Sequence, residues 1–288
     1  MFDCHIHMCS AFWPENLPRT FLEKTREAAV TGGALYSPWP EKYQRKEEDQ
    51  RWETRLESVF RFTAETPGFR PVFFLDPTEP DALVQVKTAA ERGIAAFKII
   101  CNHFYPREIL PVLSAMAECG CPVVFHSGIL YNWNLASDFN HPRAFECLLH
   151  IAGLRFLMAH IAWPWTDELI ALYGEFAWAE AAYPGRSSHM YLDLTPGTPL
   201  VFRRDMLRKL FLSGYPELEN RVLWGSDQSV ESYSSPSVQF WSAADQKFFE
   251  EVCVSAEEYR ISPARYRMLW QQVSEKNCRN FFNGQKTL

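Results

Sequence analysis

Strand-like and helix-like segments alternate along the whole chain, and this alternation restricts the possible folds more than any other feature. Short apolar runs predict strands at residues 1–7, 33–37, 70–75, 94–101, 122–126, 154–160, 189–194 and 221–226. Amphipathic spacing predicts helices between them, at 17–31, 47–65, 79–92, 107–119, 142–152, 165–180 and 203–213. Such alternation predicts an α/β fold, a parallel sheet with crossover helices. Eight strands favour closure into a (β/α)₈ TIM barrel, and a doubly wound open sheet is the main alternative.

The length of the chain and its C-terminal tail fit a single barrel domain. A (β/α)₈ barrel typically needs about 250 residues, and this chain has 288. No low-complexity linker and no internal repeat divides the sequence, so we expect one domain over residues 1–288. Residues 236–288 follow the last predicted strand, and we expect them to form a C-terminal helical extension with helices at 238–254 and 263–282.

Composition excludes several classes of protein. Hydrophobic residues make up 47% of the chain and aromatic residues 15%, which predicts a well-packed core. The net charge is −6 and the sequence contains no basic stripe, so we expect no nucleic-acid partner. No apolar run reaches the length of a membrane span, and the N-terminal strand lacks the basic start of a signal peptide. We therefore expect no membrane association.

The cysteines indicate the redox compartment. Eight of them are spread over a large, core-rich chain, and several lie inside apolar runs. Reduced thiols in a cytoplasmic protein are the expected state. Cys119 and Cys121 are too close in sequence for the usual zinc spacing, and no second pair accompanies them.

The first predicted strand carries two histidines separated by one residue, His5 and His7. Side chains alternate along a strand, so Asp3, His5 and His7 are expected on one face and Cys4 on the other. Two imidazoles on one face can reach the same metal ion, and neutral imidazole is the commonest metal ligand in proteins. On its own this pattern also fits two unrelated histidines near a terminus.

Other potential metal ligands lie at the ends of further predicted strands. His126 ends the strand at 122–126, His160 ends the strand at 154–160, and Asp227 follows the strand at 221–226. In a parallel barrel the C-terminal ends of all strands lie on one rim, where active sites form. Singly, each residue fits a core histidine or a turn aspartate. Together with His5 and His7 they predict a metal site on this rim.

The order and spacing of these residues resemble the amidohydrolase superfamily. The resemblance is strongest to the branch that contains aminocarboxymuconate-semialdehyde decarboxylase, resorcylate decarboxylase and pyrone-dicarboxylate lactonase. It spans almost the whole chain. The matching segments are Asp3–His7, Phe97–Ile99, His126–Gly128, Ala159–Pro164, Trp224–Asp227 and Glu275–Phe282. Ala162 departs from the pattern, because the family often has glycine at this position.

The resemblance implies roles for the strand-end residues. His5, His7, His126 and Asp227 would bind one divalent metal ion, with Zn²⁺ expected and Mn²⁺ also compatible with mixed nitrogen and oxygen ligands. Asp227 would also take a proton from the attacking water and pass it to the leaving group. His160 would act as an acid, a base or a group that polarises the substrate carbonyl, or else as a further ligand.

Lys98 and Asp3 are candidates for supporting roles. Lys98 lies within an apolar predicted strand, where a buried ammonium needs a partner. It could be a carboxylated bridge between two metal ions, as in some relatives, could bind a substrate carboxylate, or could pair with a neighbouring acid. We favour the substrate or supporting role over the bridge. Asp3 is expected one layer below the histidines, where it would hold a ligand in place.

Loops that follow the strands should provide the contacts to the substrate. The main candidates are Trp13, His103, Tyr131 and Trp163, and the wider set consists of Phe12, Trp165 and the ranges 102–105 and 131–134. An aromatic rim suits a flat or cyclic small molecule, although tryptophan and tyrosine are equally common in cores. Arg186 is a further candidate cation for a substrate carboxylate.

Three functions remain open from the sequence. The first is a metal-dependent hydrolase of a small ester, lactone or amide. The second is a non-oxidative decarboxylase on the same metal site, because both reactions use the same ligands. The third is a non-catalytic barrel, which predicts that some of the strand-end ligands are missing, whereas all are present. We expect a small-molecule substrate as partner, and the resemblance implies that a homodimer is one expected state.

Overall fold

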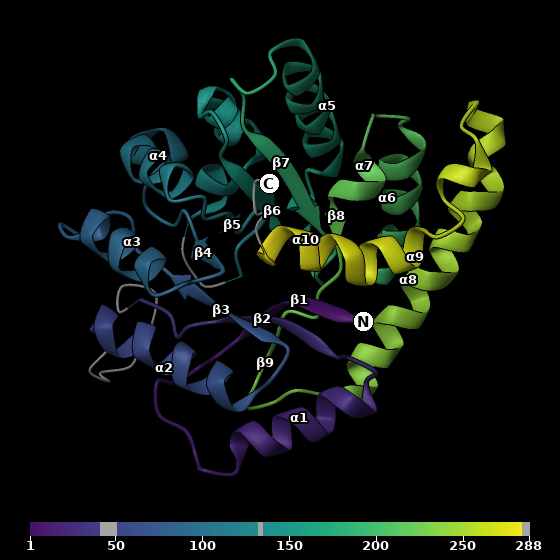
Figure 1. The fold of residues 1–288 in the computed structure, drawn as a ribbon. Coiled ribbons are helices and arrows are strands. Elements are labelled where there is room, and N and C mark those ends of the chain that lie inside the picture. The colour runs from purple at the N-terminus through teal and green to yellow at the C-terminus, as the bar shows by residue number, and fades with distance from the viewer. Residues whose placement is uncertain (41–50, 132–134, 284–288) are drawn as a thin grey trace.

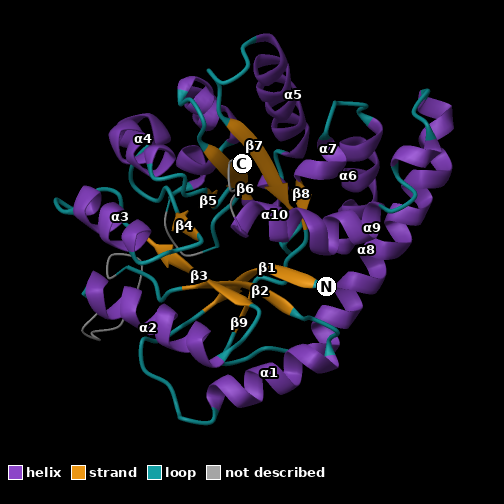
Figure 2. Ribbon diagram, viewed as in Figure 1, coloured by secondary structure: helices purple, strands orange, loops and turns teal. Residues whose placement is uncertain are grey.

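The described part of the computed structural model comprises residues 1–40, 51–131 and 135–283. Its strands form one sheet in the order β8-β7-β6-β5-β4-β3-β2-β1-β9, and every neighbouring pair is parallel. The strands lie at the centre of the molecule and the helices surround them (Figures 1 and 2). This arrangement is a (β/α)₈ TIM barrel with C-terminal helices, as the alternation predicts.

Each predicted strand is present. The strands are β1 (Phe2–His7), β2 (Gly32–Tyr36), β3 (Phe69–Phe74), β4 (Ala96–Ile99), β5 (Val123–Phe125), β6 (Arg155–Met158), β7 (His189–Asp193), β8 (Val222–Leu223) and the additional β9 (Gln228–Ser229). The segment after β8 closes the barrel against β1. The Cys4 amide donates to the Trp224 carbonyl (3.1 Å), and the Asp227 amide donates to the His5 carbonyl (2.9 Å). Residues from the two ends of the sheet are thereby joined.

Helices connect consecutive strands and cover the outside of the barrel. The α-helices are α1 (Leu17–Glu27), α2 (Trp52–Glu65), α3 (Ala82–Glu91), α4 (Leu110–Glu118), α5 (Thr166–Ala182), α6 (Leu200–Leu212), α7 (Leu218–Arg221), α8 (Ser235–Ser255), α9 (Leu269–Gln271) and α10 (Asn277–Asn283). Residues 47–50 of one predicted helix lie outside the described residues. None of the helices in the described ranges is long and apolar enough to cross a membrane.

The predicted helix at 142–152 is a 3₁₀-helix, η4 (Pro142–His150). Its buried residues are Pro142, Phe145 and Leu148, which recur every three residues. A 3₁₀-helix has three residues per turn, so this spacing places all three side chains in one row toward the core. The spacing therefore suits the tighter helix better than an α-helix.

The helix predicted at 263–282 is also broken into shorter pieces. A 3₁₀ turn, η7 (Pro263–Arg265), and α9 precede a π-helical segment, η8 (Gln272–Lys276), which continues into α10. The Val273 carbonyl accepts a hydrogen bond from the Trp224 amide (3.2 Å). Because this carbonyl binds a strand-end amide outside its own helix, the regular α-helical ladder is interrupted here.

Apolar side chains form two layers that alternate along the strands. The outer layer packs between strands and helices, and the inner layer fills the barrel. Outer residues include Leu35, Phe73, Phe97, Val123 and Phe156, and inner residues include Ala34, Val72, Ala96, Val124 and Leu157. The helix α10, yellow in Figure 1, lies across the strands near the N-terminus and adds Cys278, Phe281 and Phe282 to the inner layer.

A register shift in the middle of β1 changes which side chains face the barrel. Strict alternation predicts Asp3 on the same face as His5 and His7, and for Asp3 that prediction is wrong. Cys4 belongs to the inner layer, whereas Asp3 hydrogen-bonds to Tyr233, a residue of the outer layer. An irregularity of this kind adds a residue to one strand and so shifts the alternation beyond it. Cys4 and His5 both turn inward as a result.

Candidate metal centre

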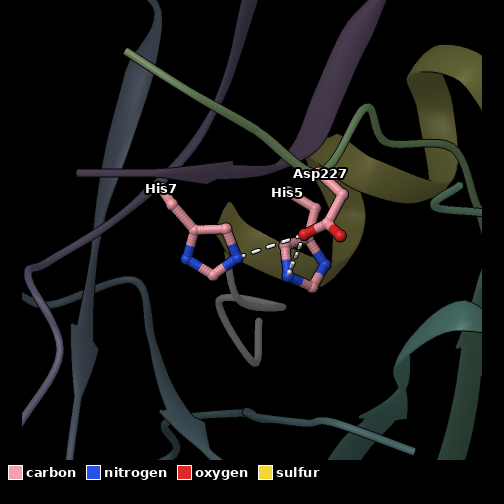
Figure 3. A group of neighbouring side chains, drawn as sticks. All are labelled: His5, His7 and Asp227. Atoms are coloured by element: carbon pink, nitrogen blue, oxygen red, sulfur yellow. Dashed lines mark hydrogen bonds and ion pairs between the residues drawn. The ribbon is translucent and has the colours of Figure 1, made fainter. Parts of the chain in front are cut away.

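Three of the predicted ligands converge at the C-terminal end of the barrel. His5 and His7 come from β1, and Asp227 comes from the segment between β8 and β9 (Figure 3). Asp227 Oδ1 lies 3.2 Å from His7 Nε2 and 3.6 Å from His5 Nε2. One candidate donor atom from each residue lies within 4.8 Å of the other two. Residues more than 200 positions apart in sequence thus form one cluster.

Asp3 supports this cluster from the outer side of β1. Its Oδ1 accepts hydrogen bonds from the backbone amides of Ser226 (2.8 Å) and His5 (3.2 Å), and its Oδ2 accepts one from the Tyr233 hydroxyl (3.0 Å). Burial raises the pKa of Asp3 to about 6, although these hydrogen bonds counteract the rise. Asp3 therefore joins the backbone of His5 to the residue before Asp227, from the outer side of β1 and not from the predicted position below the histidines.

Asp193 orients the imidazole of His5 and was missed from the sequence. It ends β7, and its Oδ2 lies 3.0 Å from His5 Nδ1. A carboxylate only accepts, so Nδ1 carries the proton and Nε2 presents its lone pair. His5 Nε2 is buried, with no hydrogen-bond partner among the described residues. Burial and the charge of Lys98 lower the pKa of His5 well below its ordinary value, so the ring is neutral, as a metal ligand must be.

The same carboxylate reaches His160 through Thr195. Asp193 Oδ1 accepts hydrogen bonds from the His160 amide (2.8 Å), the Thr195 amide (3.1 Å) and the Thr195 hydroxyl. Thr195 Oγ1 also lies 2.8 Å from His160 Nδ1. Because the single hydroxyl proton goes to Asp193, Oγ1 must accept the proton of His160 Nδ1. His160 Nε2 is then the nitrogen left for chemistry.

The backbone around His160 adopts an unusual conformation. His160, Ile161 and Ala162 all have positive φ angles, of 60°, 45° and 48°. Residues other than glycine rarely adopt positive φ angles, and such backbone strain is frequent at functional sites. The glycine that relatives often have at position 162 would adopt this conformation at no steric cost. The tight turn sets His160 beside the inner histidines, with its ring centre 5.4 Å from that of His5.

His126 directly follows β5 and lines the same cavity. It is not part of the group that His5, His7 and Asp227 form among the described residues. Its ring centre lies 4.9 Å from that of His160. His126 Nε2 is buried, and within the described ranges it makes no hydrogen bond. Burial, with the charges of His160 and Lys98, holds the pKa of His126 well below its ordinary value.

Lys98 projects from β4 into this cavity and is 1% exposed. Its Nζ forms no hydrogen bond with any described residue. The nearest aromatic face is that of Tyr36, whose ring centre lies 5.6 Å from Nζ. Burial lowers the pKa of Lys98 to about 8, and the charges of Asp193 and Asp227 limit this fall. The side chain is thus an ammonium group at neutral pH, enclosed in the cavity wall.

The cavity has a volume of about 270 Å³ and its outer part is largely apolar. Tyr131 and Trp163, two of the predicted substrate residues, line it. Additional lining residues that sequence reasoning missed are Trp39, Ile100, Ile129, Leu130, Pro196 and Gly197. The Trp39 ring stacks on His7 at 5.6 Å between ring centres. Each follows a strand, so position along the barrel was the available signal.

Other predicted substrate residues lie elsewhere. Trp13 packs against Phe62 on α2, with the Arg61 guanidinium over its ring. His103 is exposed beside Thr78, 3.3 Å from its hydroxyl. Arg186 is exposed and precedes β7, so it lies toward the opposite end of the barrel from the cavity. The structure does not bring these three side chains to the cavity. Residues 132–134 lie outside the described residues.

The donor set fits a divalent metal ion. The unsatisfied, buried Nε2 atoms of His5 and His126 are acceptors that only a proton donor or a cation can satisfy. His7 and Asp227 add a second imidazole and a carboxylate to the His5 side of the cavity. Imidazole and carboxylate ligands suit zinc and related divalent ions, and Asp193 provides the hydrogen bond that orients a ligating histidine.

Known structures share this fold at low sequence identity. A protein from Acinetobacter baumannii named as a probable 2-pyrone-4,6-dicarboxylic acid hydrolase aligns with a TM-score of 0.56 and 12% identity, over 98% of both chains. A protein with the same provisional name from Pseudomonas putida gives 0.56 and 19%, over 98% of this chain and 97% of that one. Dihydroorotase from Campylobacter jejuni gives 0.53 and 16%, over 98% and 82%.

No curated protein sequence matches the chain. A family model described as amidohydrolase, in contrast, matches residues 2–258, which include each residue of the candidate metal centre. The match covers most of the chain and begins within β1, where the two histidines lie. The chain therefore belongs to the amidohydrolase family.

Proposed function

We propose that this protein is a metal-dependent hydrolase of a small ester, lactone or amide. The observation that carries the proposal is the convergence of His5, His7 and Asp227 at one end of the barrel, in a cavity that the buried His126 also lines. A protein that used this barrel only for binding would have no need for unsatisfied imidazole nitrogens at its centre. We propose Zn²⁺ as the ion, with Mn²⁺ as the alternative.

The four residues would hold the ion, and the remaining groups would move protons. When bound, a divalent ion supplies Lewis acidity to the substrate carbonyl and to the attacking water. Burial alone would raise the pKa of Asp227, but the imidazoles of His160 and His7 hold it well below its ordinary value. Asp227 is thus an ionised proton acceptor. Its Oδ1 approaches both imidazoles of β1, so we assign acceptance of the proton to Oδ2.

His160 completes the proton transfer in this proposal. Its Nδ1 carries the proton that Thr195 Oγ1 accepts, so Nε2 is the free nitrogen of the ring. In this proposal Nε2 takes up the proton that Asp227 receives from the attacking water and then donates it to the leaving group. The ring lines the cavity beside His126 and His5. The backbone amide of His160 donates to Asp193, and its ring Nδ1 is held by Thr195. Because both bonds fix the position of the ring, little reorganisation is needed during the reaction.

We also propose that the chain belongs to the branch that includes the pyrone-dicarboxylate lactonases and the related decarboxylases. The segments that carry this resemblance, Asp3–His7, His126–Gly128 and Trp224–Asp227, all meet at the metal centre. Hydrolysis and decarboxylation would use the same ligands, and we favour hydrolysis because Asp227 and His160 offer both a base and an acid beside the metal position.

Metal content tests the proposal. Purified wild-type protein should carry about one divalent ion per chain, and His5→Ala and Asp227→Ala should each lose it. His150→Ala and Asp167→Ala are matched controls, because both residues are exposed and distant from the cavity. Elemental analysis by mass spectrometry gives the stoichiometry. Retention of the ion in both site variants would contradict the assignment.

Product analysis separates the two reactions. The metal-loaded protein should hydrolyse members of a panel of p-nitrophenyl esters, aryl amides and six-membered lactones, and Asp227→Ala should reduce the rate to background. A hydroxybenzoate in the same panel reports on decarboxylation. Release of carbon dioxide without hydrolysis of any ester, lactone or amide would replace the hydrolase proposal with the decarboxylase.

A further inference from the structure

The cavity holds an ammonium group that no described residue hydrogen-bonds. Lys98 is 1% exposed, and its Nζ makes no hydrogen bond within the described part of the chain. A charge taken out of water is strongly destabilising unless it is paired and hydrogen-bonded. The face of Tyr36, 5.6 Å away, attracts a cation but accepts no hydrogen bond of ordinary strength. A buried ammonium group of this kind is expected where a ligand supplies the missing hydrogen-bond acceptor.

The two carboxylates nearby are already engaged. Asp193 accepts hydrogen bonds from His5 and His160 and two from Thr195. Asp227 Oδ1 lies between the two imidazoles of β1. Neither carboxylate forms a salt bridge with Lys98 among the described residues, although both charges act on it at longer range. The described residues thus leave Lys98 without an acceptor, and a ligand in the cavity can supply one.

The chemistry of the ammonium group indicates which acceptor suits it. An ammonium group only donates hydrogen bonds, and ionised oxygen atoms such as those of a carboxylate are its strongest acceptors. Lys98 Nζ is buried in the wall of the cavity and makes no hydrogen bond with a described residue. An anionic group on a ligand would therefore pair with a charge that is strongly destabilising when it is left unpaired.

The rest of the cavity restricts the ligand further. Trp39, Ile129, Leu130 and Trp163 form an apolar wall beyond the polar floor, and the volume of about 270 Å³ admits only a small molecule. Binding sites of this kind fix orientation with a few polar groups and gain affinity from apolar contact. An anionic group at one end and a flat apolar body at the other match both parts.

We propose that the substrate is a small carboxylate with a flat apolar body, and that its carboxylate group accepts hydrogen bonds from Lys98 Nζ. The inference rests on the proposed hydrolase, and names its substrate class: a cyclic or aromatic acid that carries a hydrolysable ester, lactone or amide bond. Lys98 anchors the carboxylate in this arrangement, and Asp227 and His160 act on the scissile bond.

Binding of a simple carboxylate tests the anchor without turnover. The probe is benzoate and its neutral counterpart is benzamide, each titrated into zinc-loaded protein and followed by ligand-detected NMR. Lys98→Met should weaken benzoate binding by about tenfold to a hundredfold, the usual effect of losing a charge-assisted hydrogen bond. Benzamide binding should change by less than about twofold, because the apolar wall is intact. Lys87→Met, on the exposed face of α3, is the matched control and should leave both unchanged.

Two further measurements keep the anchor and the hydrolase distinguishable. Lys98→Gln, which keeps a polar end group but removes the charge, repeats the titration in case Lys98→Met folds poorly. Metal content should be the same in wild type and in both variants. Equal benzoate affinity in wild type and variants overturns the anchor and leaves the hydrolase in place, and so does loss of metal in the variants, because Lys98 would then serve the metal. Benzoate binding that depends on Lys98 in a wild-type protein that takes up no metal supports the anchor and overturns the hydrolase.

Discussion

The two ends of the barrel differ in what the inner side chains of the strands enclose. At the C-terminal end, His5 Nε2, His126 Nε2 and Lys98 Nζ are buried, and no described residue hydrogen-bonds to them. At the N-terminal end, α10 inserts Phe281 and Phe282 into the inner layer. One end thus leaves polar atoms unsatisfied around a cavity, and the other fills its space with apolar side chains.

The buried amide of Asn277 at the closed end makes the contrast sharper. This side chain lies at the start of α10 and donates to the carbonyls of Val222 (2.6 Å) and Glu219 (2.8 Å). A buried polar group without a partner is destabilising by about 1–3 kcal/mol. Asn277 avoids that loss, whereas His5 Nε2, His126 Nε2 and Lys98 Nζ around the cavity incur it.

The largest effect on stability is expected at the closed end. Phe281 is fully buried, and its ring packs against Tyr191 (5.0 Å between ring centres) and Phe282 (5.0 Å). Phe281→Ala should lower the free energy of unfolding by about 3–5 kcal/mol, because a large buried ring leaves a cavity. Denaturant titration measures the change, with the exposed Phe240 as control, where truncation should change stability by less than about 0.5 kcal/mol.

The loss of stability in Phe281→Ala should not reduce metal binding by the protein that remains folded. If the two ends are independent, Phe281→Ala retains the wild-type metal content per folded chain. If the variant loses its metal under conditions where every chain is folded, the aromatic side chains of α10 also shape the metal centre. The two ends would then not be independent.

The open end should become more stable with rising pH. In metal-free protein the pKa of Lys98 is about 8, below its ordinary value of 10.5, because burial disfavours the charged form. Between these pH values the unfolded chain binds more protons than the folded one, so the free energy of unfolding rises as the pH increases. The full rise from this group is about 3 kcal/mol.

Comparison with Lys98→Met isolates this contribution. The difference in stability between the two proteins should shrink from pH 8 to pH 10.5, with the variant more stable at the lower value. Urea titrations of chelator-treated protein at several pH values provide the measurement, and other groups cancel in the difference. Parallel pH profiles would mean that burial does not lower the pKa of Lys98, and that this side chain does not destabilise the open end.

Much of the fold was predictable because hydrophobic periodicity and turn-forming residues are local signals. Each strand was found within a few residues, since apolar runs and the flanking proline and glycine residues are visible in the sequence. Finer features depended on partners far away. The π-helical segment exists because Val273 binds the Trp224 amide, and the register shift in β1 turned Asp3 outward. Both features depend on contacts between residues that are far apart in sequence, so no local pattern predicted either of them.

The candidate site divides in the same way. His5, His7 and Asp227 were found because their positions at strand ends place them on one rim. Asp193 is the second-to-last residue of the strand predicted at 189–194 and nearly met the same criterion, but the sequence analysis did not select this carboxylate. Trp13 was chosen for its residue type, and packing against α2 took it away from the cavity. Position along the barrel was thus a better guide than chemistry alone.

Asp193 tests whether the open end is organised beyond its metal ligands. Its carboxylate fixes the proton on His5 Nδ1 and so directs Nε2 toward Asp227. Asp193→Asn keeps the shape but can turn an amide group, a donor, toward His5 Nδ1. Metal affinity should fall by about tenfold to a hundredfold, the usual effect of losing the carboxylate behind a ligating histidine. Competition with a zinc-binding dye measures it, and unchanged affinity would remove Asp193 from the metal centre.

Thr195 should produce the smallest effect and separates metal binding from proton transfer. Its hydroxyl donates to Asp193 and accepts from His160 Nδ1, so Thr195→Val releases the His160 ring and leaves the contact between Asp193 and His5. We expect unchanged metal affinity and a loss in metal-dependent hydrolysis of about tenfold, at the low end for an acid–base group that is misplaced but present.

Thr195→Ser restores the hydroxyl and should restore the rate, whereas a purely structural role for the methyl group would leave the serine variant as impaired as the valine one. The pH profile of the surviving activity gives a second readout, because valine frees the tautomer that threonine fixes on His160. A valine variant that loses its metal would place Thr195 with Asp193 in support of His5. A valine variant that keeps both metal and rate would show that His160 needs no orientation, and the proton relay proposed for the open end would have to run through Asp227 alone.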